Sequence, residues 1–199
     1  MARITIPYAV ADFIDLRERG FYYVDKTDYI PKLEDYNAPV FLRPRRFGKS
    51  LLISTLEAYF LGKKELFEGL AIEKLEKDWT VYPIFHMDLN TEKYDTRESL
   101  DSILNFTLEK WEQQYGTAPS EKTFALRFRG LIERAYEQTG QRVVILIDEY
   151  DKPMLQAIGN EELQKEFRNT MKAFYSVLKT MDGCIQFAFL TGVTKFGKV

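Results

Sequence analysis

Gly48-Lys49-Ser50 is the feature that most constrains this chain, because it stands between an apolar run and an amphipathic stretch in FLRPRRFGKSLLISTLEAYF, residues 41–60. A loop between a strand and a helix binds phosphate when its N–H groups converge on the anion and the helix N-terminus adds positive potential. The lysine then reaches the β- and γ-phosphates, and the hydroxyl that follows it ligates magnesium. Arg43 occupies the usual place of a first glycine. Two interpretations stay open here: a nucleotide site, or a solvated basic turn.

The loop has a substitute for the absent glycine. Pro44 fixes its own φ and restrains Arg43 to extended geometry, so rigidity shapes the start of the loop. Gly48 is the position where close approach of the backbone to phosphate matters most. The flanking arginines either neutralise phosphate charge or remain solvated. The predicted phosphate-contacting residues are Pro44, Arg45, Arg46, Phe47, Gly48, Lys49, Ser50 and Leu51.

A second motif, VVILIDEYDKP at residues 143–153, supports the nucleotide interpretation. Five aliphatic residues bring Asp148 to the C-terminal end of a buried strand, where open α/β sheets bind their ligands. An aspartate there holds magnesium, commonly through water, and the adjacent Glu149 can polarise a water for attack on the γ-phosphate. Together with the upstream lysine loop, this pair predicts a nucleoside-triphosphate site with Asp148 and Ser50 as metal ligands.

Four apolar runs, near residues 39–43, 82–89, 142–148 and 184–192, are predicted strands. Helical patterns lie between them, which predicts a three-layer αβα fold with a mostly parallel sheet. The motif order is typical of P-loop NTPases of the ASCE type, in which the last of these strands inserts between the phosphate-loop strand and the acidic strand. Thr191, at the end of that strand, is a candidate for orienting the attacking water; ending a strand is the alternative role.

Helix boundaries follow from polar residues ahead of apolar stripes. Asn160 and Ser120 are predicted N-caps, and Asp95 with Glu98 resembles a capping box. The segment before residue 39 predicts two short helices. His86 alternates within the second strand and is predicted to be a packed residue, since no Cys or His cluster surrounds it.

Composition excludes several classes. The 28 Lys and Arg nearly balance 30 Asp and Glu, which gives no whole-chain argument for binding nucleic acid or an anionic membrane. One cysteine cannot form an internal disulfide. No window approaches the roughly 20 apolar residues that a spanning helix needs. We therefore expect a soluble cytoplasmic protein without a membrane segment.

With these motifs placed, the chain resembles the bacterial AAA-ATPase-like family of P-loop ATPases. The segments that carry the resemblance are IPYAVADFIDLRERGFYYVDKTDYIPKLE, VFLRPRRFGKSLLISTLEAYF, VVILIDEYDKP and FLTGVTKFGKV. The resemblance implies ATP binding, with Lys49 on the phosphates, Ser50 and Asp148 on Mg²⁺, and Glu149 as the catalytic base. It also implies that YYVDKT, residues 22–27, lies beside the nucleotide.

Family proteins typically continue into a fifth strand, a helical lid and often a C-terminal nuclease-like domain of the PD-(D/E)XK type. We expect residues 1–38 to be a helical lead-in packed on the core and 39–199 to be an ATPase core that stops before the fifth strand. The function implied is an ATPase motor or switch module of a larger protein. The alternative is a regulatory or scaffold domain that binds nucleotide without appreciable hydrolysis and serves the nuclease-like domain. Contact with nucleic acid would then be indirect at most.

Overall fold

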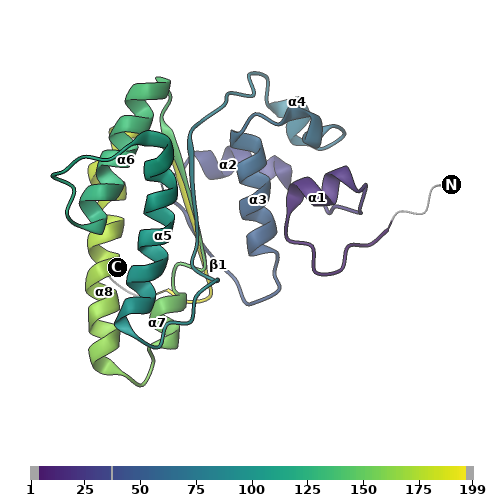
Figure 1. Ribbon diagram of the computed structural model, residues 1–199. Helices are drawn as coiled ribbons and strands as arrows, with labels where there is room; N and C mark the ends of the chain where they lie inside the picture. The colour runs from purple at the N-terminus through teal and green to yellow at the C-terminus, as the bar shows by residue number, and fades with distance from the viewer. Residues whose placement is uncertain (1–4, 37, 196–199) are drawn as a thin grey trace.

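The computed structural model describes residues 5–36 and 38–195, which form a parallel sheet between two layers of helices (Figure 1). The four strands are β1 (Val40–Leu42), β2 (Ile84–Asp88), β3 (Val143–Asp148) and β4 (Ile185–Gly192). Their order is β1-β4-β3-β2, and each neighbouring pair is parallel. The predicted insertion of the last strand between the phosphate-loop strand and the acidic strand is therefore confirmed.

The register brings the carboxyl ends of the strands to one edge of the sheet. Asp88 pairs with Asp148 across β2 and β3, and Leu42 pairs with Gly192 across β1 and β4. Ligands of open α/β sheets bind outside this edge, at the point where neighbouring strands diverge in their connections. The loops that follow the four strands are thus the part of the fold that can build a site.

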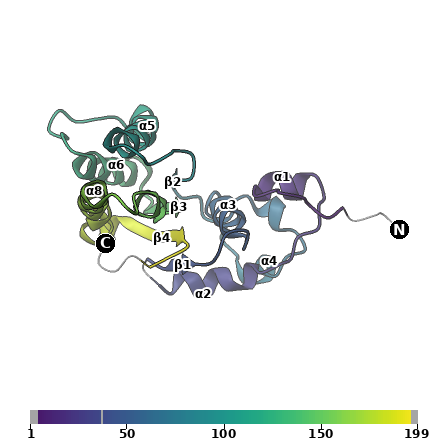
Figure 2. The same ribbon diagram turned by 90° about the horizontal axis from the view of Figure 1, so that it is seen from below.

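β3 is buried along its whole length, because its alternate residues serve two different cores. Val143, Ile145 and Ile147 lie in one apolar cluster, and Val144 and Leu146 lie in the other. A strand covered on both faces has no solvent-facing row, which explains the unbroken aliphatic run in its sequence. Figure 2 shows the sheet between the two groups of helices.

Three long helices cover one face: α5 (Arg97–Tyr115), α6 (Phe124–Thr139) and α8 (Glu161–Thr180). Their apolar stripes meet under the sheet, where the ring of Phe128 stacks on that of Phe174 with centroids 4.4 Å apart. The short helices α7 (Lys152–Gln156) and η3 (Asp182–Cys184) follow β3 and precede β4.

The other face is covered by α3 (Lys49–Phe60) and by the segment before β1. This segment contains α1 (Phe13–Glu18), η1 (Thr27–Tyr29) and α2 (Ile30–Glu34), so two short α-helices precede β1, as predicted. Phe13 and Ile30 are fully buried in the same cluster as residues of α3. The chain between α3 and β2 adds η2 (Lys64–Phe67) and α4 (Ile72–Leu75).

The helix caps agree with the sequence at one position and differ at two. The side chain of Asn160 accepts the N–H of Leu163 and caps α8, as predicted. α6 is capped by Thr123, because Ser120 belongs to the turn before it. α5 begins after Thr96 without a side-chain cap, since the carboxylate of Asp95 pairs with Lys93. Among the helices of the described residues, none is long and apolar enough to cross a membrane.

Candidate functional site

The GKS motif lies where the sequence places it, between β1 and α3. Gly48 is the N-cap of α3 and has a φ of 75°, a left-handed conformation that glycine adopts without strain. A Cβ at this position would meet nothing within 4 Å of the protein, so the backbone angle is what favours glycine. Arg46 also has a positive φ of 66°. The loop therefore turns through two left-handed residues before the helix begins.

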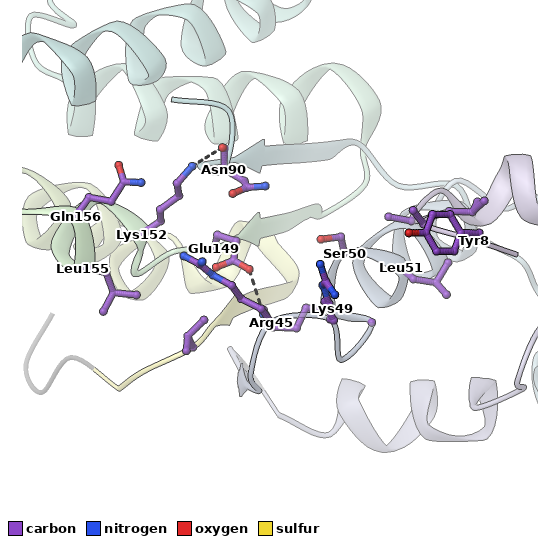
Figure 3. Close-up of a pocket in the computed structure, with 16 residues that line it drawn as sticks. Tyr8, Arg45, Lys49, Ser50, Leu51, Asn90, Glu149, Lys152, Leu155 and Gln156 are labelled. Atoms are coloured by element: carbon purple, nitrogen blue, oxygen red, sulfur yellow. Dashed lines mark hydrogen bonds and ion pairs between the residues drawn. The ribbon is translucent and has the colours of Figure 1, made fainter. Parts of the chain in front are cut away.

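Lys49 is a buried lysine whose charge is shared. Only 4% of its side chain is exposed, and its Nζ lies 3.1 Å from Oε1 of Glu149. The ammonium also donates to the carbonyl oxygens of Arg43 and Pro44, at 3.2 Å and 3.3 Å. Figure 3 shows this ion pair across the site, from the first residue of α3 to the loop after β3. The lysine and the glutamate of the two sequence motifs are thus in direct contact.

The acidic strand end is joined to β4 by one threonine. Asp148 and Thr191 are both buried, and the Thr191 hydroxyl donates to Oδ1 of Asp148. The same hydroxyl accepts the N–H of Glu149 at 3.3 Å. Glu149 has a φ of 55°, uncommon for a residue with a Cβ, and such strain clusters at functional sites. Thr191 therefore fixes the relative position of the two acidic residues.

These elements surround a cavity of about 590 Å³ at the carboxyl edge of the sheet (Figure 3). Seven of the predicted site residues line it: Arg45, Arg46, Gly48, Lys49, Ser50, Leu51 and Glu149. The other four, Pro44, Phe47, Asp148 and Thr191, are not on its wall. Phe47 is largely exposed, whereas Asp148 and Thr191 are buried at the strand ends. The cavity therefore gathers one basic loop and one acidic residue around a common space.

Sequence reasoning missed several wall residues. They are Tyr8, Ala9, Val10, Ala11, Asn90, Lys152, Leu155, Gln156 and Val193. Asn90 follows the end of β2 and Val193 follows β4, so their places at strand ends were a usable signal. The lead-in residues carried no such signal. Tyr8 lines the same cavity as Leu51, which is near the start of α3 (Figure 3).

Another part of the lead-in was expected beside the nucleotide, and in the structure it does not line this cavity. Within YYVDKT, Asp25 accepts the N–H groups of Thr27 and Ala71, at 2.9 Å and 2.7 Å. Burial opposes ionisation of this carboxyl, but these N–H donors outweigh it and lower the pKa of Asp25. The motif therefore ties the lead-in to the start of α4. Residues 8–11, rather than 22–27, reach the cavity.

His86 is packed in β2, as predicted, and its Nδ1 lies 2.9 Å from Oε2 of Glu57 in α3. Burial disfavours the charged imidazole, yet the hydrogen bond and charge of Glu57, with the charges of Asp88 and Asp148, raise the pKa of His86. Among the described residues, no group of three or more His, Cys, Asp or Glu could hold a metal ion. His86 thus joins α3 to the sheet.

A family model described as "Predicted AAA-ATPase" matches residues 7–199. This chain belongs to the AAA-ATPase-like family. Membership indicates nucleotide binding, in agreement with a loop of the P-loop kind at the edge of a parallel sheet. The final residues of the FLTGVTKFGKV segment, 196–199, lie outside the described residues.

The AAA-ATPase-like chain is also similar to a curated protein of Azotobacter chroococcum mcd 1, named "Uncharacterized protein in vnfD 5'region". The two are 37% identical over 202 residues, which include 100% of this chain. The chain spans 39% of the length of that relative. No solved structure matches.

Proposed function

We propose that this chain binds ATP with magnesium in the 590 Å³ cavity and hydrolyses it. The observation that carries the proposal is Lys49, a buried cation at the first residue of α3. Burying a lysine is costly unless its charge is compensated. Here Glu149 and two loop carbonyls compensate it, and a triphosphate would offer a stronger partner at the same place.

The phosphates would lie against the loop and the N-terminus of α3. Lys49 would contact the β- and γ-phosphates, with the loop N–H groups and the positive end of the helix beside them. Arg45 and Arg46 line the cavity and supply the charge that balances a triphosphate. Leu51 would bound the site on the helix side, and Pro44 and Phe47 would shape the loop from outside the cavity wall.

Magnesium fits the donor set that the chain offers. Ser50 lines the cavity, and Asp148 lies buried at the end of β3 with Oδ1 bonded to the Thr191 hydroxyl. Both would supply oxygen ligands, which this hard cation prefers. Mg²⁺ is commonly held by one or two protein oxygens together with phosphates and water, so a large cluster of acidic residues is not required. When bound, it would neutralise charge that develops on the phosphates.

Glu149 is the proposed general base, and Thr191 would hold it in place through its N–H. A second candidate function, nucleotide binding without hydrolysis, is favoured by one contact. The carboxylate of Glu149 pairs with Lys49 and would have to leave it before accepting a proton from water. A regulatory or scaffold domain would need only the binding half of this site.

The larger assembly is also part of the proposal. We propose that the lead-in and core, divided near residue 38, act as the motor or switch of a longer protein. A fifth strand, a lid and a nuclease-like domain would complete it. The relative's greater length is compatible with this arrangement. Any contact with nucleic acid would then be made by the attached domain.

Titration of a fluorescent, non-hydrolysable ATP analogue with Mg²⁺ tests binding. Lys49→Ala is expected to weaken the affinity by at least about tenfold, the effect of losing one charged hydrogen-bond donor. Lys172→Ala removes the same charge from an exposed position on α8 and serves as the matched control. Equal affinity of the wild type and Lys49→Ala would contradict a nucleotide site at this loop.

Phosphate release tests hydrolysis. The wild type should release phosphate from ATP, and Glu149→Gln should not. If neither protein turns ATP over while both bind the analogue, the binding-only function stands in place of hydrolysis.

A further inference from the structure

Asp151 is a fully buried carboxylate beside the site, and the roles assigned above do not use it. It lies two residues after Glu149 and directly before α7. Its Oδ2 accepts three hydrogen bonds: from the N–H of Val193 at 2.7 Å, the N–H of Thr194 at 2.6 Å and the Thr194 hydroxyl at 3.1 Å. Hydrogen bonds to an ionised acceptor are stronger than neutral ones, and leaving such a group unpaired in the interior is costly. Asp151 therefore clamps the loop after β3 to the loop after β4.

Neighbouring groups make the same connection. The N–H of Tyr150 donates to the carbonyl of Thr191 at 2.8 Å, and the Tyr150 hydroxyl donates to the carbonyl of Thr194 at 2.8 Å. Gly192 is packed against both side chains: an added Cβ would lie 2.6 Å from the Tyr150 ring and 2.8 Å from Oδ1 of Asp151. There is no room at residue 192 for any side chain. The two loops are therefore held at one fixed separation.

The clamped segment carries the parts of the site that face the acidic strand end. Val193 lines the cavity, and Thr191 bonds both Asp148 and the N–H of Glu149. A shift of residues 191–194 would move all three contacts together. Yet Oδ1 of Asp151 is buried and has no hydrogen-bond partner among the described residues. A polar group left unsatisfied in the interior calls for a reason beyond stability.

We propose that Asp151 is a positioning residue that sets the γ-phosphate end of the site, and so the preference for a triphosphate over a diphosphate. It acts through residues 191–194 and does not itself touch the nucleotide. This inference rests on the proposed nucleotide function. It adds that the discrimination between ATP and ADP depends on Asp151, a carboxylate of the acidic motif that contacts neither the phosphates nor the magnesium.

The test is the dissociation constant of the Mg²⁺ complex of a non-hydrolysable ATP analogue, compared with that of ADP. Asp151→Ala is expected to weaken analogue binding by about tenfold, within the usual range of coupling between distinct sites, while ADP binding changes by less than about twofold. Asp25→Ala is the matched control, because Asp25 also joins two distant segments through N–H donors but does not line the cavity. The midpoint temperature of thermal unfolding should fall in both variants, whereas the ratio of the analogue's dissociation constant to that of ADP should rise only in Asp151→Ala.

Asp151→Asn keeps the inference testable if Asp151→Ala does not fold, because it preserves the shape of the side chain and one acceptor oxygen. This variant should also lower the preference for the analogue over ADP. Unchanged preference in a folded Asp151 variant, or equal weakening of both ligands, would overturn the inference while the Lys49→Ala effect remains. Failure of the wild type to bind either nucleotide would overturn the proposed function and this inference with it.

Discussion

Replacing Glu149 by Gln should tighten nucleotide binding even though it removes the proposed base. Oε1 of Glu149 lies 3.1 Å from Nζ of Lys49, and the two side chains are only 16% and 4% exposed. An incoming phosphate must compete with this carboxylate for the lysine and also approaches its negative charge. Glutamine has no negative charge, so it competes less with phosphate for Lys49 and does not repel it.

The size of the effect follows from the contacts. A hydrogen bond to a charged group contributes about 1.5–3 kcal/mol. The carbonyl oxygens of Arg43 and Pro44 still hold Lys49 in the variant, so only part of its stabilisation is lost. We therefore expect a gain near the lower limit, about 1.5 kcal/mol, which is about tenfold in Kd.

The assay is titration of a non-hydrolysable ATP analogue, with Mg²⁺ and again with excess EDTA. The competition between carboxylate and phosphate does not depend on metal, so the gain should persist in EDTA. Glu121→Gln is the control: it makes the same charge change in a comparably buried ion pair, with Arg134, outside the cavity wall. Unchanged or weaker binding by Glu149→Gln in EDTA would refute the reasoning.

Three further predictions concern the fold. Burial disfavours the charged imidazole, but Glu57 outweighs it and raises the pKa of His86 above its usual value. The stability gained from the charged pair is therefore full just below the unfolded pKa of about 6.5, where Glu57 is still ionised, and is lost as pH rises through the raised pKa. The difference in unfolding free energy between wild type and His86→Gln should shrink as pH rises above about 6.5. Asn160→Ala should lower the free energy of unfolding, measured in urea, by about 1 kcal/mol, and a change near zero would mean that the α8 cap contributes little. Phe128→Ala, which removes a stacked ring from the core, should cost about 3–5 kcal/mol, and a loss under about 1 kcal/mol would contradict the packing described.

The sequence predicted the sheet well because its signals are local and its topology follows general rules. The aliphatic run ending at Asp148 reflects burial on both faces, and right-handed parallel crossovers leave few possible strand orders. The strand order and the position of His86 within β2 could therefore be predicted from the sequence. The predicted caps at Ser120 and Asp95 were wrong for two reasons. A capping side chain must also stand at the residue where the backbone turns into the helix, which for α6 is Thr123. The carboxylate of Asp95 is instead paired with Lys93.

Contacts between segments that are distant in the sequence could not be predicted in the same way. Asp25 bonds the N–H of Ala71, 46 residues later, and no pattern around either residue indicates the other. Tyr8 and Val10 reach the cavity only because the lead-in packs on α3. The motif residues were predicted from their types, whereas the Lys49–Glu149 contact depends on how two loops are placed. The roles of Ser50, Asp148 and Thr191 in binding stay predictions.

Hydrogen–deuterium exchange with and without Mg²⁺ and the ATP analogue tests the central claim most directly, because it reports where the nucleotide lies. Peptides covering residues 43–52 should gain protection, since the loop N–H groups and the N-terminus of α3 would bind phosphate. Peptides from the α5–α6 connection should not change. Protection elsewhere in the chain, with residues 43–52 unaffected at saturating ligand, would contradict a phosphate site at this loop.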